Sequence, residues 1–265
     1  MKQLVYIIFA IITLASCQEK VDIDLGFAGE KLVVEGYVSN ETDSSFVKLH
    51  LTAPYLGNEP SPAITNAVVE VTEDNNPAVI FTHVGDGLYK PAPGYKGIAD
   101  KTYKLKVVYD GKEYTSESKL EPMFEVDPVL QQEFRPADGF IEEGFAITYL
   151  SRDSRDPVKY TWFNFGKNDT LENFDVLFDS ENTVLNQWLP FELPFFRAQK
   201  GDSVMMIFRS IDAGTSSYIT ALNSLSNGAP GPFQTPPANP PTNIKGGAVG
   251  LFYAADVVRR WRIVN

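Results

Sequence analysis

The sequence predicts an all-β body behind an N-terminal export signal, and two observations support this fold class. Short runs in which every second residue is apolar recur from about residue 31 to the end of the chain. Turn-forming residues, above all Asp-Gly, Asn and Pro, separate these runs at close spacing. Alternation with a period of two is typical of half-buried strands, and many short strands between turns are typical of β-sandwiches.

The first sixteen residues have the features of a lipoprotein signal peptide. Lys2 gives a basic start, and the apolar run from Leu4 to Leu14 follows it. This run is too short for a membrane-spanning helix, which needs about 20 residues, but it has the length of a signal-peptide core. Leu14-Ala15-Ser16-Cys17 then resembles a lipobox and contains the only cysteine of the chain. We therefore expect cleavage before Cys17 and lipidation of that residue.

Residues 17–30 are predicted to be a tether between the lipid anchor and the first strand. Their charged part runs from Gln18 to Asp24. In Bacteroidota-type lipoproteins, an acid-rich stretch after the lipidated cysteine directs the protein to the outer face of the outer membrane. An ordinary solvated linker has the same composition, so both interpretations remain open.

Residues 31–120 are predicted to form a β-sandwich of immunoglobulin or transthyretin type. The clearest feature is a hairpin in which Asp110-Gly111 joins Thr102–Tyr109 to Lys112–Ser118, because Asp-Gly suits a type I′ turn. His50 alternates with apolar neighbours and is expected on the solvent side. The other strand-like runs of this domain are 32–38, 47–51, 68–72, 79–82 and 88–89.

A linker is expected at residues 121–128, where Pro122 and Pro128 interrupt the alternation, and a second, mostly β domain at 129–265. Apolar residues at helical spacing predict one short helix over Ser216–Leu225, capped by Ser216 or Ser217. The Pro-rich stretch Gly228–Pro241 is expected to be a surface loop. Strand-like runs in this domain are 145–150, 160–165, 174–178, 203–210 and 248–253.

The charge of the chain makes nucleic acid an unexpected partner. The formal net charge is −11 at pH 7, which repels phosphate groups. The exception is the short basic run Arg259-Arg260-Trp261-Arg262 near the C-terminus.

No catalytic, metal-binding or cofactor-binding residues stand out, so the sequence does not predict an enzyme. The two histidines, His50 and His83, have no metal-ligand spacing. Gly201-Asp202-Ser203 resembles an esterase block, but no histidine base follows it, and a turn before a strand explains it better. Carboxylate pairs leave a hydrolase as a remote alternative.

Aromatic residues are dense between Trp162 and Phe196, particularly around Trp188, Phe191 and Phe195. Exposed aromatic side chains stack on sugars, peptides or partner proteins, whereas buried ones form a core. The core interpretation is preferred here, and the ligand-binding interpretation remains open.

Four segments together resemble a Bacteroidota family of outer-membrane lipoproteins with no assigned function. They are Leu32–Val38, Ala67–Val71, Gly201–Val204 with Arg209–Asp212 and, most specifically, Asn239–Gly247. Members of that family are typically encoded beside TonB-dependent receptors of the nutrient-uptake class. One departure is Gly250-Leu251-Phe252-Tyr253, where the family more often has glycine, an aromatic residue, phenylalanine and glycine.

The resemblance implies a lipid-anchored outer-membrane protein at the cell surface, acting as an accessory binding component of a TonB-dependent uptake system. Its partners would be the receptor and a nutrient ligand, either peptide or glycan. The Pro-rich loop 228–241 and the aromatic segment around Trp188 are the expected contact regions. The alternative function is a cell-surface adhesion or structural module.

Overall fold

The computed structural model describes residues 29–53, 60–152, 160–168, 170–171, 176–179, 186–193, 195–226 and 240–265. The predicted signal peptide, Cys17 and most of the tether lie outside these residues. So does most of the predicted Pro-rich loop, residues 228–239. The fold and the candidate site are therefore built from the body that begins at Lys31.

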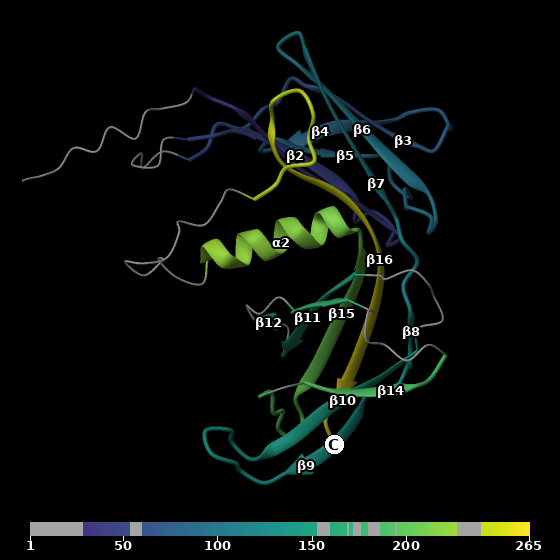
Figure 1. Ribbon diagram of the computed structural model, residues 1–265, viewed down its shortest axis with the longest axis vertical. Helices are drawn as coiled ribbons and strands as arrows, with labels where there is room; N and C mark the ends of the chain where they lie inside the picture. The colour runs from purple at the N-terminus through teal and green to yellow at the C-terminus, as the bar shows by residue number, and fades with distance from the viewer. Residues whose placement is uncertain are drawn as a thin grey trace, which may run out of the picture. The chain divides into compact units, whose positions relative to one another are not determined.

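Strands dominate the described residues and are accompanied by the helix α2, which confirms the all-β prediction (Figure 1). The N-terminal strands are β1 (Leu32–Ser39), β2 (Phe46–Leu51), β3 (Val68–Glu73), β4 (Val79–Gly85), β5 (Leu88–Lys90), β6 (Thr102–Tyr109) and β7 (Lys112–Lys119). The later elements are β8 (Glu125–Val126), β9 (Gln131–Arg135), β10 (Gly144–Arg152), β11 (Tyr160–Lys167), β12 (Thr170–Leu171), β13 (Val176–Asp179), β14 (Leu189–Glu192), β15 (Ser203–Ile211), α2 (Ala213–Ser226) and β16 (Val249–Ile263).

These strands form two sheets. The larger sheet has the order β12-β11-β15-β16-β1-β2-β5-β4-β3-β6-β7, with β13 also pairing with β11. The smaller one has the order β14-β10-β8, with β9 also pairing with β10. The predicted linker 121–128 therefore contains a short strand, β8, which pairs with the end of β10.

The hairpin predicted at Asp110-Gly111 is confirmed. β6 and β7 pair in register from Thr102 opposite Lys119 to Tyr109 opposite Lys112. Both turn residues have positive φ, 50° at Asp110 and 69° at Gly111, as a type I′ turn requires.

The last strand, β16, joins the two halves of the chain. Its first part runs parallel to β1, from Val249 beside Val33 to Ala255 beside Ser39. Its second part runs antiparallel to β15, as far as Ile263 opposite Ser203. Lys31–Asn265 consequently form one compact unit, and strands from both expected parts, 31–120 and 129–265, contribute to the larger sheet.

The segment just before β16 connects this strand to β7, which is the last strand in the order of the large sheet. The Asn243 side chain donates from Nδ2 to the Phe252 carbonyl (2.6 Å) and accepts from the Phe252 N–H (3.0 Å). The backbone of Lys245 pairs with Thr115 of β7 in both directions, with N···O distances of 2.7 and 3.3 Å. The distinctive Asn243–Gly247 motif therefore has a structural role in closing the N-terminal half.

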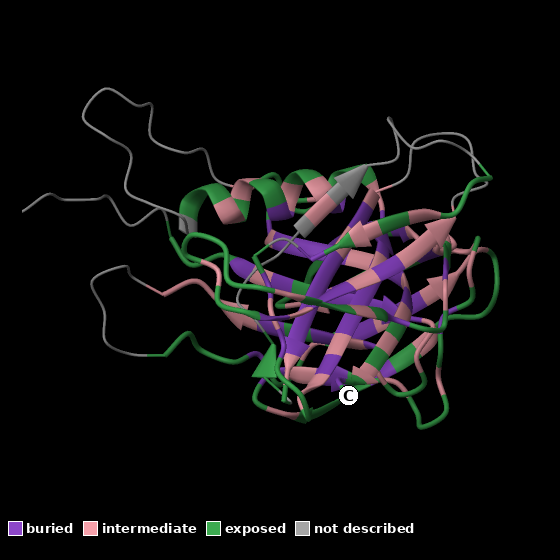
Figure 2. Ribbon diagram, turned by 90° about the horizontal axis from the view of Figure 1, so that it is seen from below, coloured by how far each residue is buried: buried purple, intermediate pink, exposed green. Residues whose placement is uncertain are grey.

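Three hydrophobic clusters stabilise the body, and their buried positions lie along the strands (Figure 2). The first lies among strands of the N-terminal half and the beginning of β16, and it includes Val34, Leu49, Val71, Phe81, Leu105 and Phe252. The second includes Ile147, Tyr149, Phe163, Phe165, Met206 and Phe208. The third joins the two halves and includes Tyr37, Ile207, Ile211, Ile219, Ala255 and Val257.

The predicted helix is present, but it begins at Ala213, and its N-cap is Asp212 in place of Ser216 or Ser217. The Thr215 N–H donates to Asp212 Oδ1 over 2.7 Å, which is the bond expected of an N-cap carboxylate. The other carboxylate oxygen accepts from Ser118 Oγ at 2.6 Å. Asp212 therefore caps the helix and ties it to β7.

Replacing Asp212 with alanine should lower the free energy of unfolding by about 1–2 kcal/mol, because a helix cap and a hydrogen bond to β7 are both lost. Ser217→Ala is the matched control, since the Ser217 hydroxyl only donates to the Ala213 carbonyl within the helix. Urea unfolding of the two variants measures the difference. Equal stability of both variants would contradict the assignment of Asp212 as the cap.

Candidate functional site

The candidate site is the outer face, defined as one side of β11, β15 and β16. Alternation along β15 sends Val204, Met206 and Phe208 into the second cluster, so its odd-numbered residues point to the opposite side. The pairing register places residues of β11 and β16 beside them. The outer face consists of Tyr160, Trp162, Asn164, Gly166, Ser203, Met205, Ile207, Arg209, Ile211, Ala255, Val257, Arg259, Trp261 and Ile263.

Helix α2 covers part of this face (Figure 2). Ile219 of the helix is buried in the third cluster together with Ile207 and Ile211. Farther along β16 the side chains are open to solvent, since Trp261 is 68% exposed and Ile263 is 51% exposed. An exposed tryptophan beside other apolar side chains is a common feature of binding surfaces.

Arg209 lies half-buried near the centre of the outer face. Its guanidinium carbon is 4.8 Å from the centroid of the Trp162 ring, a cation–π distance, and Nη1 donates to Asn164 Oδ1. Tyr253, whose ring centroid is 6.1 Å from that of Trp162, extends the aromatic group towards Tyr37. Within the described part of the chain, no carboxylate oxygen lies within 4.0 Å of the Arg209 guanidinium nitrogens.

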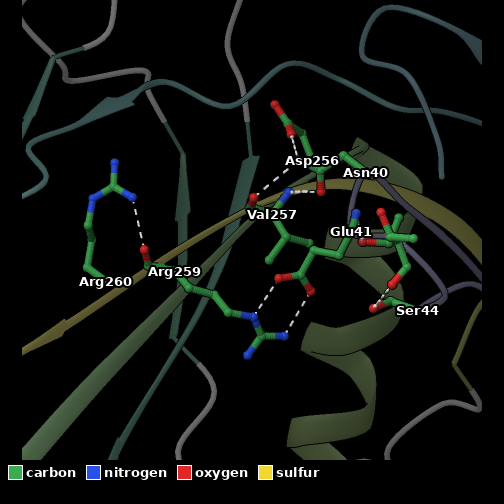
Figure 3. Close-up of polar contacts among 9 residues, drawn as sticks. Asn40, Glu41, Ser44, Asp256, Val257, Arg259 and Arg260 are labelled. Atoms are coloured by element: carbon green, nitrogen blue, oxygen red, sulfur yellow. Dashed lines mark hydrogen bonds and ion pairs between the residues drawn. The ribbon is translucent and has the colours of Figure 1, made fainter. Parts of the chain in front are cut away.

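The neighbouring Arg259 has a different environment. Its Nε and Nη2 donate to the two carboxylate oxygens of Glu41, at 2.6 and 2.9 Å (Figure 3). Such a bidentate pair is stronger than a single hydrogen bond and raises the pKa of Arg259. Arg259 is thus already neutralised by a partner on the loop after β1, whereas Arg209 is held only by neutral groups.

A polar junction next to the outer face fixes β16 to the rest of the body (Figure 3). Asn40 accepts from the Val257 N–H at 2.8 Å and donates to the Val257 carbonyl at 3.2 Å. It also donates to the Asp256 carboxylate, whose second oxygen accepts from the Met123 N–H at 2.8 Å. The Asn40 amide therefore extends the pairing of β1 with β16 beyond Ser39, and Asp256 connects both to residue 123.

A scan against protein-family models matches residues 18–260 to the Domain of unknown function (DUF4249). The chain belongs to the DUF4249 family. The match includes the three strands of the outer face up to Arg260 and the polar junction. A search of curated proteins found no match.

In this DUF4249 chain, the other two arginines of the basic run bind backbone carbonyls. Arg260 donates to the carbonyls of Asp127 and Val126 at 2.9 and 2.6 Å. Arg262 donates to the Leu130 carbonyl at 2.6 Å and to the Gln132 side chain. The run that looked like a basic surface patch therefore anchors the segment from 126 to 132.

The aromatic segment predicted as core is divided between core and surface. Phe163, Phe165 and Phe196 are buried, in agreement with that prediction. Trp188 is 43% exposed, with the Arg152 guanidinium 5.1 Å from its ring centroid, and Phe195 is 83% exposed. The segment thus contributes side chains both to the core and to the surface.

The residues considered for chemistry also have structural surroundings. The imidazole of His83 is exposed and lies 5.3 Å from the Tyr89 ring, while His50 is half-buried and lies on the face of β2 that also carries the exposed Lys48. Asp202 accepts from the Asn168 side chain and the Gln199 N–H, and both bonds lower the pKa of its carboxyl. This confirms that Gly201-Asp202-Ser203 is a turn leading into β15.

The described residues contain no group of three or more His, Cys, Asp or Glu side chains placed to hold a metal ion. Among them there is also no helix with the length and hydropathy needed to cross a membrane.

The environment of Arg209 could not be predicted directly from the sequence. Arg209 and Trp162 are 47 positions apart, and only the pairing of β11 with β15 brings them opposite each other. Alternation along 203–211 could have shown that Met205, Ile207 and Arg209 share a face, but it could not show the facing strand.

Proposed function

We propose that this member of the DUF4249 family is a lipid-anchored protein of the outer membrane, exposed at the cell surface, and an accessory binding component of a TonB-dependent nutrient-uptake system. The observation that carries the proposal is the position of Cys17. It is the only cysteine, it ends an apolar signal-like run, and the family match begins at residue 18.

The chemistry of such an anchor supports this role. Each buried methylene of an acyl chain contributes about 0.8 kcal/mol, so several chains on one cysteine hold a protein firmly on a membrane. An anchored protein shares two dimensions with its receptor, so their effective concentration is high, and a small contact area is enough for binding. The resemblance to outer-membrane lipoproteins encoded beside TonB-dependent receptors supports the choice of partner.

The outer face supports a binding role over a purely structural one. It combines the exposed Trp261 with an arginine, Arg209, that has no carboxylate partner among the described residues. A structural module that only spaces other proteins has no need for such a surface. We keep adhesion as the alternative function, because surface proteins of both kinds use aromatic side chains to bind.

Replacing Cys17 with alanine should abolish lipidation and release the protein from the membrane, because the acylated residue is removed. Labelled palmitate and membrane fractionation measure the effect, with Ser16→Ala as a control that keeps the cysteine and a small residue before it. Protease treatment of intact cells tests surface exposure of the wild type. Palmitate label on the Cys17→Ala protein, or protection of the wild type from protease, would contradict the proposal.

A further inference from the structure

The charge of the outer face differs in sign from that of the whole protein. None of its positions on β11, β15 and β16 is Asp or Glu. Of its two arginines, Arg259 is paired with Glu41, so the positive charge of the face comes from Arg209. The chain as a whole has a net charge of −11. A positive region on an acidic protein selects for anions at that place, because the remaining surface repels them.

Within this region, Arg209 is the cation with donor capacity left over. A guanidinium has five N–H groups, and Arg209 is hydrogen-bonded to Asn164 and Tyr37, which leaves donors for a ligand. Stacking on Trp162 holds the guanidinium plane in place, and its N–H edge is where a ligand would bind. A carboxylate matches this edge, since it can accept two parallel N–H bonds.

The pairing of the strands argues against an extended peptide as the ligand. β11 is paired with β15 on one side and with β12 and β13 on the other. β16 is paired with β15 and β1. A peptide that binds by strand addition needs a strand with an unpaired edge. Along their paired residues these strands have a neighbour on both sides, so they present no such edge.

Two aromatic side chains of the outer face indicate what the rest of the ligand consists of. Trp162 and Trp261 lie two strands and four residues apart, which corresponds to roughly 16 Å on a flat sheet. This span suits a short chain of rings, whose apolar faces pack on aromatic side chains while their polar groups stay in solvent.

We propose that the outer face binds an oligosaccharide carrying carboxylate groups, with a carboxylate on Arg209 and sugar rings against Trp162 and Trp261. This inference rests on the proposed function and names the chemical class of its ligand. The helix α2 forms one wall, because Ile219 is packed on the same face.

The test uses the full-length lipidated protein in detergent and three probes: trigalacturonic acid, the neutral maltotriose and a hexaglutamate peptide. Calorimetry should show that trigalacturonic acid binds most tightly. Arg209→Gln should weaken this binding about ten- to hundred-fold, because charge-assisted hydrogen bonds are lost, and Arg209→Lys should weaken it less. Trp261→Ala should weaken it about ten-fold.

Arg135→Gln is the matched control, since Arg135 pairs with Glu133 and Glu192 on a different sheet. It should change the affinity less than two-fold. Because Arg209 is half-buried, thermal unfolding checks its variants, and the exposed Trp261 tests the face if they unfold. The inference is overturned if trigalacturonic acid does not bind, if hexaglutamate or maltotriose binds equally well, or if the control weakens binding as much as Arg209→Gln.

The two proposals fail separately. A receptor that co-purifies with a protein unable to bind trigalacturonic acid would overturn only the ligand class. Binding of the sugar acid without any receptor would overturn only the proposed function.

Discussion

Replacing Gly250 with alanine is expected to lower the free energy of unfolding by more than about 3 kcal/mol, the largest change in stability that we predict for a single methyl group. A Cβ atom at this position would lie 2.1 Å from the Val34 carbonyl oxygen. The φ angle of 107° is also one that residues with side chains rarely adopt. The parallel pairing of β1 and β16 would have to separate to make room.

Gly214→Ala is the control for this prediction. The Cβ atom there meets only the Asp212 carboxylate at 3.4 Å, which is an ordinary contact, and alanine favours the helix. We expect its stability to be unchanged or raised by up to about 1 kcal/mol. Chemical unfolding of both variants measures the contrast, and a Gly250→Ala protein as stable as Gly214→Ala would show that β1 and β16 are not packed this closely.

The second large effect is expected at Asn243, whose replacement by alanine should cost about 2–4 kcal/mol. Two hydrogen bonds to the backbone of Phe252 are lost, and the N–H and carbonyl of this fully buried residue are left without them. Asn76→Ala is the control, because the Asn76 side chain makes an exposed contact with Glu73. Hydrogen exchange of the Phe252 amide should rise in the Asn243 variant only, and unchanged protection would contradict the assigned contact.

The hairpin at Asp110-Gly111 and the contacts of Asn243 show where sequence reasoning was sufficient and where it was not. The hairpin at Asp110-Gly111 was predictable because its turn and both strands are neighbours along the chain. The role of Asn243 was not, because its partners on β7 and β16 are defined only by the fold. The motif stood out in the sequence without showing what it contacts.

The length of β16 was missed for a related reason. The predicted run ended at residue 253, whereas β16 continues to Ile263 and includes Arg260 and Arg262. In the structure both point towards the segment from 126 to 132 and bind its carbonyls. Alternation of polar and apolar residues identifies a strand only while the inward-facing positions are apolar, and here half-buried arginines occupy them.

The helix and the candidate face illustrate the same limit. Apolar spacing located the helix, but the expected caps, Ser216 or Ser217, lie four and five residues after the observed cap, Asp212. Arg209 looked like an ordinary strand residue until the pairing of β11 with β15 placed Trp162 opposite it. Contacts between distant segments therefore account for most of what the sequence did not predict.

The central claim is that the anchored protein works with a TonB-dependent receptor, and purification of the lipidated wild type from membranes in mild detergent tests it most directly. Mass spectrometry should identify a TonB-dependent outer-membrane receptor that is retained with the protein and is missing when Cys17→Ala is purified in the same way. Retention of other surface proteins without any such receptor would contradict the account and favour the adhesion function.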